Sequence, residues 1–174
     1  MHLPGKLMTE TGMKRLTYSD LAQAAAKRIR ELDPWDLESH LAANPGTLLL
    51  DIREREEFAT GHIPGSINVP RGILEAATEW NYPETVEELV LARQKPVVVI
   101  CRSGNRSAMA AETLGMLGYE NVVSLRLGIR AWNDDVMPLV DNAGTTVDSD
   151  AAATHIDPEI RPDQIDPARR KNGN

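Results

Sequence analysis

Hydrophobic residues along the chain fall into short runs separated by helical periodicity. Two runs, TLLLDI at 47–52 and PVVVIC at 96–101, are apolar and rich in β-branched residues, which is typical of strands covered on both faces. Weaker runs of the same kind lie at 66–70 and 121–125. This alternation predicts an α/β fold with a mostly parallel central sheet and helices on both faces. The helical patterns between the runs lie at residues 53–60, 84–93 and 107–118.

The two ends of the chain differ from this middle part. Residues 19–32 begin with helix-cap types and keep apolar residues on one stripe, which predicts an amphipathic helix. A second helix is predicted after Asp33-Pro34, a pair typical of a helix start. Beyond Pro138 the chain carries scattered Pro and Asp and no Phe, Tyr or Trp, which predicts a flexible acidic tail. The expected divisions are an N-terminal extension over 1–32, one α/β domain over 33–140 and a tail over 141–174.

Composition narrows the class of protein. With 174 residues, 41% hydrophobic and 26% charged, the chain fits one globular core. Nineteen basic against 26 acidic residues leave a net charge of −7, which argues against nucleic acid as the main partner. No apolar stretch approaches the roughly 18 residues of a membrane-spanning helix, and the first residues lack a signal-peptide pattern. We therefore expect a cytoplasmic protein without nucleic-acid or membrane partners.

Cys101 is the only cysteine, which excludes an internal disulfide and a zinc site built on paired cysteines. It ends a buried run and is followed by the turn RSGNR and a helical pattern. In such a strand–turn–helix setting, the backbone N–H groups of 102–107 can converge on an anion at the helix N-terminus. Gly104 supplies the backbone freedom that this turn requires. The thiol of Cys101 is therefore predicted to be ionised at neutral pH, with Arg102 and Arg106 beside it.

Three ordered motifs carry a resemblance to a known family. CRSGNRS at 101–107 is preceded by LLDIREREEFATGHIPGSINVP at 49–70 and followed by LGIRAW at 127–132. In this order the motifs resemble the rhodanese, or sulfurtransferase, family of the single-domain type, over about residues 33–138. The family more often has two consecutive glycines where this chain has Leu127-Gly128, a departure that affects the turn near Trp132.

The resemblance implies a rhodanese-like parallel sheet and a persulfide on Cys101. Such a protein moves sulfane sulfur from a donor, thiosulfate or another persulfide, to a nucleophilic acceptor, which is cyanide in an assay and a thiol in the cell. A sulfur-carrier protein is one candidate acceptor, since a chain without a second cysteine must discharge its sulfur to an external group. No cofactor and no metal are expected.

The expected site residues fall into three groups. Cys101 is the predicted nucleophile. Asp51 and Arg53 are predicted to support the site as an ion pair, and His62 through a structural hydrogen bond rather than as a base. The loop residues expected to bind substrate, the arginines through their charge and the others mainly through their amides, are Arg102, Ser103, Gly104, Asn105, Arg106 and Ser107.

Two alternative functions stay open at this point. A phosphatase or arsenate reductase would use the same cysteine on a bound oxyanion. Related proteins with that chemistry carry one more loop residue, whereas four residues separate Cys101 from Arg106 here, which favours sulfur. A rhodanese-fold binding or regulatory module would use the two ends of the chain to recruit a partner. Degenerate family members typically lose the cysteine, and this chain keeps it.

Overall fold

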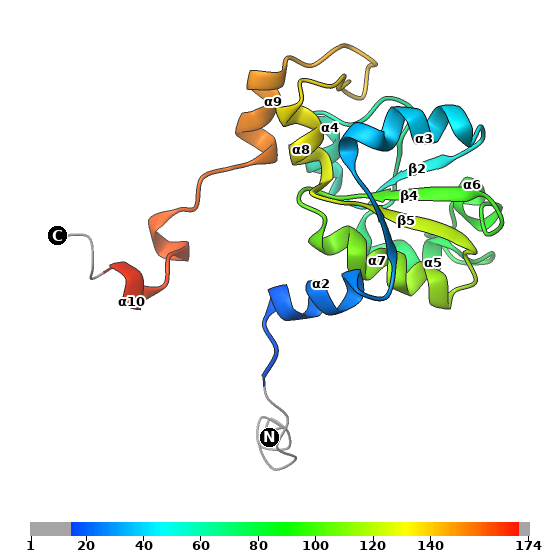
Figure 1. Ribbon diagram of the computed structural model, residues 1–174, viewed down its shortest axis with the longest axis horizontal. Coiled ribbons are helices and arrows are strands. Elements are labelled where there is room, and N and C mark those ends of the chain that lie inside the picture. Colours follow the sequence, from blue (N-terminus) through cyan, green and yellow to red (C-terminus); the bar gives the residue numbers. More distant parts are fainter. Residues whose placement is uncertain (1–14, 171–174) are drawn as a thin grey trace.

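A computed structural model of the chain describes residues 15–170 and contains a five-stranded sheet (Figure 1). Every strand pair in this sheet is parallel, and the strand order is β1-β5-β4-β2-β3. The predicted α/β fold class is confirmed. The strands are β1 (Arg30–Leu32), β2 (Leu48–Asp51), β3 (Ile67–Asn68), β4 (Pro96–Ile100) and β5 (Asn121–Leu125).

Helices cover both faces of the sheet. One face carries α5 (Leu74–Ala77), α6 (Glu87–Val90) and α7 (Asn105–Met116), with α2 (Tyr18–Ala26) packed on α7. The other face carries α3 (Leu37–Ala43), α8 (Gly128–Asp134) and α9 (Ser149–Ile156). The remaining short elements are α4 (Arg55–Ala59), α10 (Pro167–Arg170) and the 3-10 turns η1 (Pro34–Asp36), η2 (Arg71–Ile73) and η3 (Pro162–Gln164). Within residues 15–170, no helix has the length and apolarity needed to cross a membrane.

Successive residues of the central strand β4 point into different cores. Val99 and Cys101 lie in the core shared with α7, whereas Val98 and Ile100 lie in the core shared with α8. This period of two is the ordinary geometry of a strand. It places the sulfur of Cys101 on the α7 face, at the carboxyl end of the central strand, where parallel α/β sheets bind their ligands.

The first predicted helix is too long. Helix α2 ends at Ala26, and residues 30–32 form β1, which pairs with β5 through Arg30 and Val123 and through Leu32 and Leu125. A three-residue strand is too short to show the alternation of apolar and polar residues that marks a strand. Its apolar residue, Leu32, coincidentally falls on the apolar stripe of the predicted helix. The sheet therefore begins inside the segment 1–32 that we expected to be an extension. Residues 1–14 of that segment lie outside the described residues.

Part of the predicted tail packs on the domain. Helix α9 begins after Asp148, whose side chain accepts hydrogen bonds from two backbone N–H groups of the first turn. Ala152 and Ile156 share one face of this helix and are buried in the core next to α8. The expectation of a flexible tail is therefore wrong for residues 148–156, because two apolar residues four positions apart anchor a helix whose other residues are polar or alanine. From 157 to 169 every side chain is exposed.

Candidate active site

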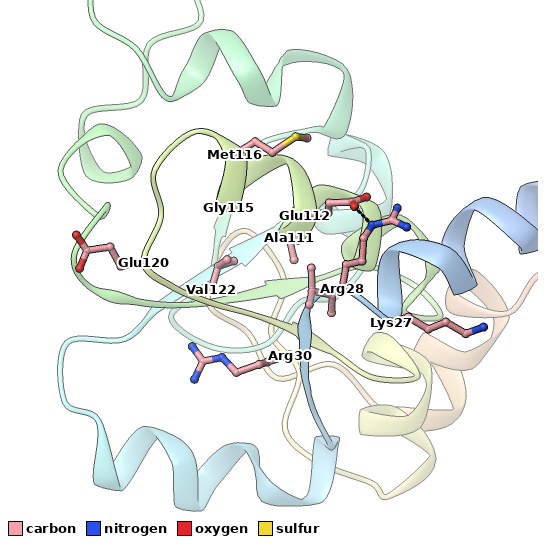
Figure 2. Close-up of a pocket in the computed structure, with 10 residues that line it drawn as sticks. Lys27, Arg28, Arg30, Ala111, Glu112, Gly115, Met116, Glu120 and Val122 are labelled. Atoms are coloured by element: carbon pink, nitrogen blue, oxygen red, sulfur yellow. Dashed lines mark hydrogen bonds and ion pairs between the residues drawn. The ribbon is translucent and has the colours of Figure 1, made fainter.

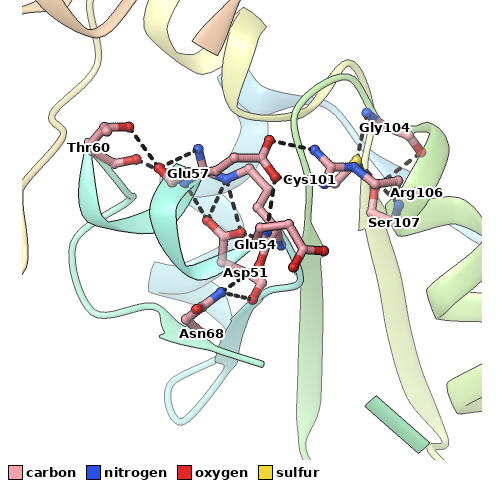
Figure 3. Close-up of polar contacts among 11 residues, drawn as sticks. Asp51, Glu54, Glu57, Thr60, Asn68, Cys101, Gly104, Arg106 and Ser107 are labelled. Carbon is pink, nitrogen blue, oxygen red and sulfur yellow. Dashed lines mark hydrogen bonds and ion pairs between the residues drawn. The ribbon is translucent and has the colours of Figure 1, made fainter. Parts of the chain in front are cut away.

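The sulfur of Cys101 lies in a cradle of backbone N–H groups. Cys101 follows β4 directly, and the loop after it leads into α7. Its Sγ accepts hydrogen bonds from the N–H of Gly104 at 3.1 Å and of Ser107 at 3.3 Å (Figure 3). The residue is only 1% exposed. Amides converging at a helix N-terminus stabilise negative charge, so this position suits a thiolate or a persulfide anion.

Gly104 allows the loop to close against the turn before α8. It adopts a left-handed conformation with φ of +91°, and a Cβ there would lie 2.9 Å from the backbone N of Leu127. Leu127 also has a left-handed conformation, with φ of 63°, although it is not a glycine. The position at which the chain departs from the family's double glycine therefore keeps a backbone that glycine favours.

The N-terminus of α8 is bound directly to the Cys101 loop. The N–H groups of Ile129 and Arg130 donate to the carbonyl oxygens of Cys101 and Arg102, at 2.9 and 3.1 Å. A Cβ at Gly128 would lie 2.4 Å from the carbonyl oxygen of Cys101. We expected Gly128 to matter only for the turn in its own motif. The structure makes it a contact that shapes the cradle.

Two buried serine hydroxyls lie next to the sulfur. The thiol of Cys101 donates to Ser107 Oγ at 3.3 Å, and Ser107 Oγ lies 2.8 Å from Ser124 Oγ. Ser124 points toward α7 because its neighbours in β5, Val123 and Leu125, point into the other core. Once the thiol is ionised, Ser107 can donate to the sulfur while Ser124 donates to Ser107. Sequence reasoning missed Ser124. The only indication in the sequence is that Ser124 is a polar residue within an apolar segment that predicts a strand.

Arg106 is held by a carboxylate that sequence reasoning also missed. Its guanidinium donates to both carboxylate oxygens of Glu57 in α4, at 2.8 and 2.7 Å (Figure 3). Burial alone raises the pKa of Glu57, but hydrogen bonds from Arg106 and from the N–H of Glu54 outweigh it and hold the pKa below its ordinary value. The same pairing raises the pKa of Arg106. The guanidinium expected to hold substrate thus fixes the end of the loop, and substrate binding by it stays a prediction.

The three predicted supporting residues fix the segment that presents Glu57. Arg53 is buried and pairs with the buried carboxylate of Asp51 across 2.8 Å. Another nitrogen of the same guanidinium donates to the carbonyl oxygen of Glu57 at 3.2 Å. His62 stacks on Phe58, with ring centroids 3.7 Å apart, and its Nδ1 lies 3.0 Å from the carbonyl oxygen of Phe58. These contacts hold α4 and the turn after it against the sheet.

The other loop residues face the surface. Ser103 and Asn105 are half-buried and border a cavity of about 190 Å³ that reaches α2. The side chain of Arg102 is exposed. Among the described residues it makes no ion pair, which leaves its charge available at the mouth of the site.

A larger cavity, of about 530 Å³, lies away from this loop. Figure 2 shows it between the turn after α2 and helix α7, where Arg28 pairs with Glu112. Lys27 and Glu120 also line it, and no residue from 101 to 107 does. The charged side chains that line this cavity are either paired or exposed to solvent, and none of the lining residues is a nucleophile. We therefore place the chemistry at the Cys101 loop.

A model of the Rhodanese-like domain family matches residues 33–135. The chain belongs to this family. The match confirms the family expected from the three motifs, and it ends before α9. The packed helix and the segment after it are therefore additions to the rhodanese-like region.

Relatives of this rhodanese-like chain are named for sulfur chemistry. A sulfurtransferase of Allochromatium vinosum is 34% identical over 116 residues, which is 67% of this chain and 99% of that protein. A putative sulfur carrier protein of Bacillus subtilis, YrkF, is 36% identical over 85 residues, 48% of this chain and 40% of that one. The adenylyltransferase and sulfurtransferase UBA4 of Meyerozyma guilliermondii is 32% identical over 94 residues, 53% of this chain. This chain spans only 22% of that enzyme's length.

Solved structures resemble the rhodanese-like fold at similar identity. A rhodanese-related protein from Thermoplasma volcanium has a TM-score of 0.52 at 35% identity, covering 64% of this chain and 97% of that one. A protein of unknown function from Rhodopseudomonas palustris, described as a possible tyrosine phosphatase, has a TM-score of 0.64 at 29% identity. That likeness covers 73% of this chain and 96% of the other.

Proposed function

We propose that the protein is a sulfurtransferase that carries sulfane sulfur as a persulfide on Cys101. The observation that supports this most directly is the enclosed Sγ with amides at 3.1 and 3.3 Å, in a loop with four residues between Cys101 and Arg106. A loop this short suits a single sulfur anion at Sγ better than a tetrahedral oxyanion. It is present in a chain whose family and named relatives point to the same chemistry.

The reaction balances without a cofactor. The Cys101 thiolate attacks the outer sulfur of thiosulfate, a new S–S bond forms, and the S–S bond of thiosulfate breaks as sulfite leaves with the electron pair. An acceptor, cyanide or a thiolate, then attacks the terminal sulfur of the persulfide. The electron pair of that S–S bond returns to Cys101. The negative charge stays on or beside Sγ throughout, so the amides of Gly104 and Ser107 stabilise each state.

The charged groups around the loop have different roles in this proposal. Arg102, exposed and unpaired among the described residues, attracts the anionic donor. Arg106 keeps the loop in shape through Glu57. Because Cys101 is the only cysteine, the persulfide discharges to an external thiol. A sulfur-carrier protein is a candidate acceptor, supported by the relative named as one. The cytoplasm is the proposed location, because a chain with one cysteine suits a reducing compartment.

Intact-mass measurement after incubation with thiosulfate tests the proposal. We expect the protein to gain the mass of one sulfur atom and to lose it when cyanide is added. Cys101→Ala should show no gain and no thiocyanate formation while keeping its circular dichroism spectrum. Thiocyanate formation by the Ala variant above background would refute a persulfide on Cys101.

The phosphatase alternative is kept because a similar structure is described as a possible tyrosine phosphatase. Its test is the hydrolysis of p-nitrophenyl phosphate by the same preparation. We expect no hydrolysis above that of Cys101→Ala, because the loop is too tight for phosphorus to sit in line with the sulfur. Efficient hydrolysis without any uptake of sulfur would replace the sulfurtransferase proposal with this one.

A further inference from the structure

Asn68 holds the turn that follows β2. It lies in the edge strand β3, where it pairs in register with Asp51, and it is half-buried. Its side-chain amide donates to two backbone carbonyl oxygens, that of Asp51 at 3.0 Å and that of Arg53 at 2.9 Å (Figure 3). One side chain thus fixes the backbone on both sides of Ile52.

The other side of this turn is bound to the strand that carries the nucleophile. The strand order places β2 between β3 and β4. The N–H of Ile52 donates to the carbonyl oxygen of Ile100 at 2.9 Å, and Ile100 immediately precedes Cys101. The turn is therefore held between Asn68 on one side and the end of β4 on the other.

Arg53 connects the turn to α4 and to the segment after it. Its guanidinium donates to the carboxylate of Asp51 and to the carbonyl oxygen of Gly61, both at 2.8 Å, and to the carbonyl oxygen of Glu57 at 3.2 Å. The side chain is only 2% exposed, and hydrogen bonds from a buried charged group are strong and directional. Because Asn68 binds the backbone of Arg53, it also fixes the point from which this guanidinium extends.

We propose that Asn68 is a positioning residue for sulfur transfer at Cys101, although it lies two strands away in the sheet. Its effect passes through Arg53 to Glu57, which then holds Arg106 at the end of the cysteine loop. Without the two hydrogen bonds from Asn68, the turn gains freedom and the amides around the sulfur lose alignment, which slows the reaction. The inference rests on the proposed function and adds a positioning residue to it.

Asn68→Ala tests the inference, with Asn44→Ala as the matched control. Asn44 is also half-buried and donates to the carbonyl oxygen of His40 at 2.9 Å, at the end of α3 and before the amino end of β2. We expect both variants to lower Tm, but only Asn68→Ala to lower kcat/KM for thiosulfate, about fivefold. An unchanged kcat/KM would overturn the inference. Asn68→Leu, which keeps a branched side chain without N–H groups, gives the same comparison if the Ala variant does not fold.

A double-mutant cycle with Glu57→Gln tests the path from Asn68 to the loop. We expect kcat/KM to fall about fivefold in Asn68→Ala, about tenfold in Glu57→Gln and again about tenfold in the double variant, because the second change acts on a path that is already broken. A fall of about fiftyfold, the product of the two single effects, would mean independent routes and would overturn the inference.

Hydrogen exchange separates this inference from the proposed function. We expect the amides of residues 101–107 to exchange faster in Asn68→Ala, relative to those of β5, which report any general loss of stability. Asn44→Ala should leave this ratio unchanged. If the unmodified protein formed no thiocyanate, the proposed function would be refuted, while the exchange ratio would still decide whether Asn68 positions the loop. Equal ratios in the two variants would overturn the inference.

Discussion

Arg106 and Glu57 join the end of the Cys101 loop to α4 through two hydrogen bonds, at 2.8 and 2.7 Å. The two residues are 49 positions apart, and the pair adds α4 to the elements that hold the loop. Bidentate pairs between a guanidinium and a carboxylate fix orientation as well as distance. The geometry of the amides around Sγ therefore depends on α4 and on the buried Asp51–Arg53 pair behind it.

The first prediction concerns the chemistry that depends on this pair. Glu57→Gln keeps the shape of the side chain and removes its charge. Because hydrogen bonds to charged groups are worth about 1.5 to 3 kcal/mol and this pair is half-buried, we expect the lower end, a roughly tenfold fall in kcat/KM for thiosulfate. The measurement is thiocyanate formation under first-order conditions. Glu75→Gln, which removes the surface pair with Arg71, is the control and should leave kcat/KM unchanged.

The pair should also make stability depend on pH. The pKa of Glu57 is lower in the folded protein than its ordinary value of 4.5, so its stabilisation is fully present above that value and is lost as the pH falls through the folded pKa. We expect the difference in Tm between the unmodified protein and Glu57→Gln to be constant from pH 6 to 7, ~2 units above that ordinary pKa. It should shrink below about pH 4. A difference that grew on acidification would contradict this sign.

A second prediction concerns the approach of α8 to the loop. Gly128→Ala places a methyl group 2.4 Å from the carbonyl oxygen of Cys101, at a φ of +65°. We expect persulfide formation to fall more than about tenfold and Tm to drop, because the loop or α8 must move. Gly115→Ala is the matched control, since a Cβ there meets nothing within 4 Å in the exposed part of α7. That variant should be as active as the unmodified protein and stabilised by about 0.5 to 1 kcal/mol.

A third prediction concerns the buried hydroxyls. Ser124→Ala removes the hydroxyl that lies 2.8 Å from Ser107 Oγ, the group next to the sulfur. We expect kcat/KM for thiosulfate to fall about fivefold, because a hydrogen bond that supports the charged sulfur is worth about 1 kcal/mol. Thiocyanate formation under first-order conditions measures this change. An unchanged kcat/KM together with a lowered Tm would mean that Ser124 serves packing alone.

A fourth prediction separates the packed and exposed parts of the C-terminal segment. Ile156→Ala should lower the free energy of unfolding by about 2 to 5 kcal/mol, because Ile156 is buried next to α8. Ile160→Ala changes an exposed residue four positions later and should stay within about 0.5 kcal/mol of the unmodified protein. Urea unfolding of both variants measures the two values. Equal effects would mean that α9 is not held on the domain in solution.

Local patterns carried much of the fold and part of the site. The strands around Leu50 and Val98 are apolar over 48–50 and 96–100, so their burial on both faces could be predicted from composition alone. The need for a glycine at position 104 could also be predicted, because a tight turn between a strand and a helix requires a residue with a freer backbone. The edge strand at 30–32 and helix α9 could not be predicted in this way. Each is stabilised by a few residues that pack on an element far away in the sequence. Such contacts leave no periodic pattern of apolar residues in the segment itself.

The missed site residues share a cause. Glu57, Ser124 and Gly128 act on the loop from α4, β5 and α8, and their partners are fixed only when the sheet is assembled. A glutamate in a charged run, a serine in a strand and one glycine of a turn have ordinary surface or turn interpretations. Their roles follow from which way each element faces, and strand order and register decide that.

The enclosure of one thiol has a practical consequence for work on this protein. Because Cys101 is the sole cysteine and is 1% exposed, reaction with a small alkylating reagent counts working nucleophiles one for one in any preparation. A series of alkylating reagents of increasing width would measure the diameter of the entrance by the size at which labelling slows.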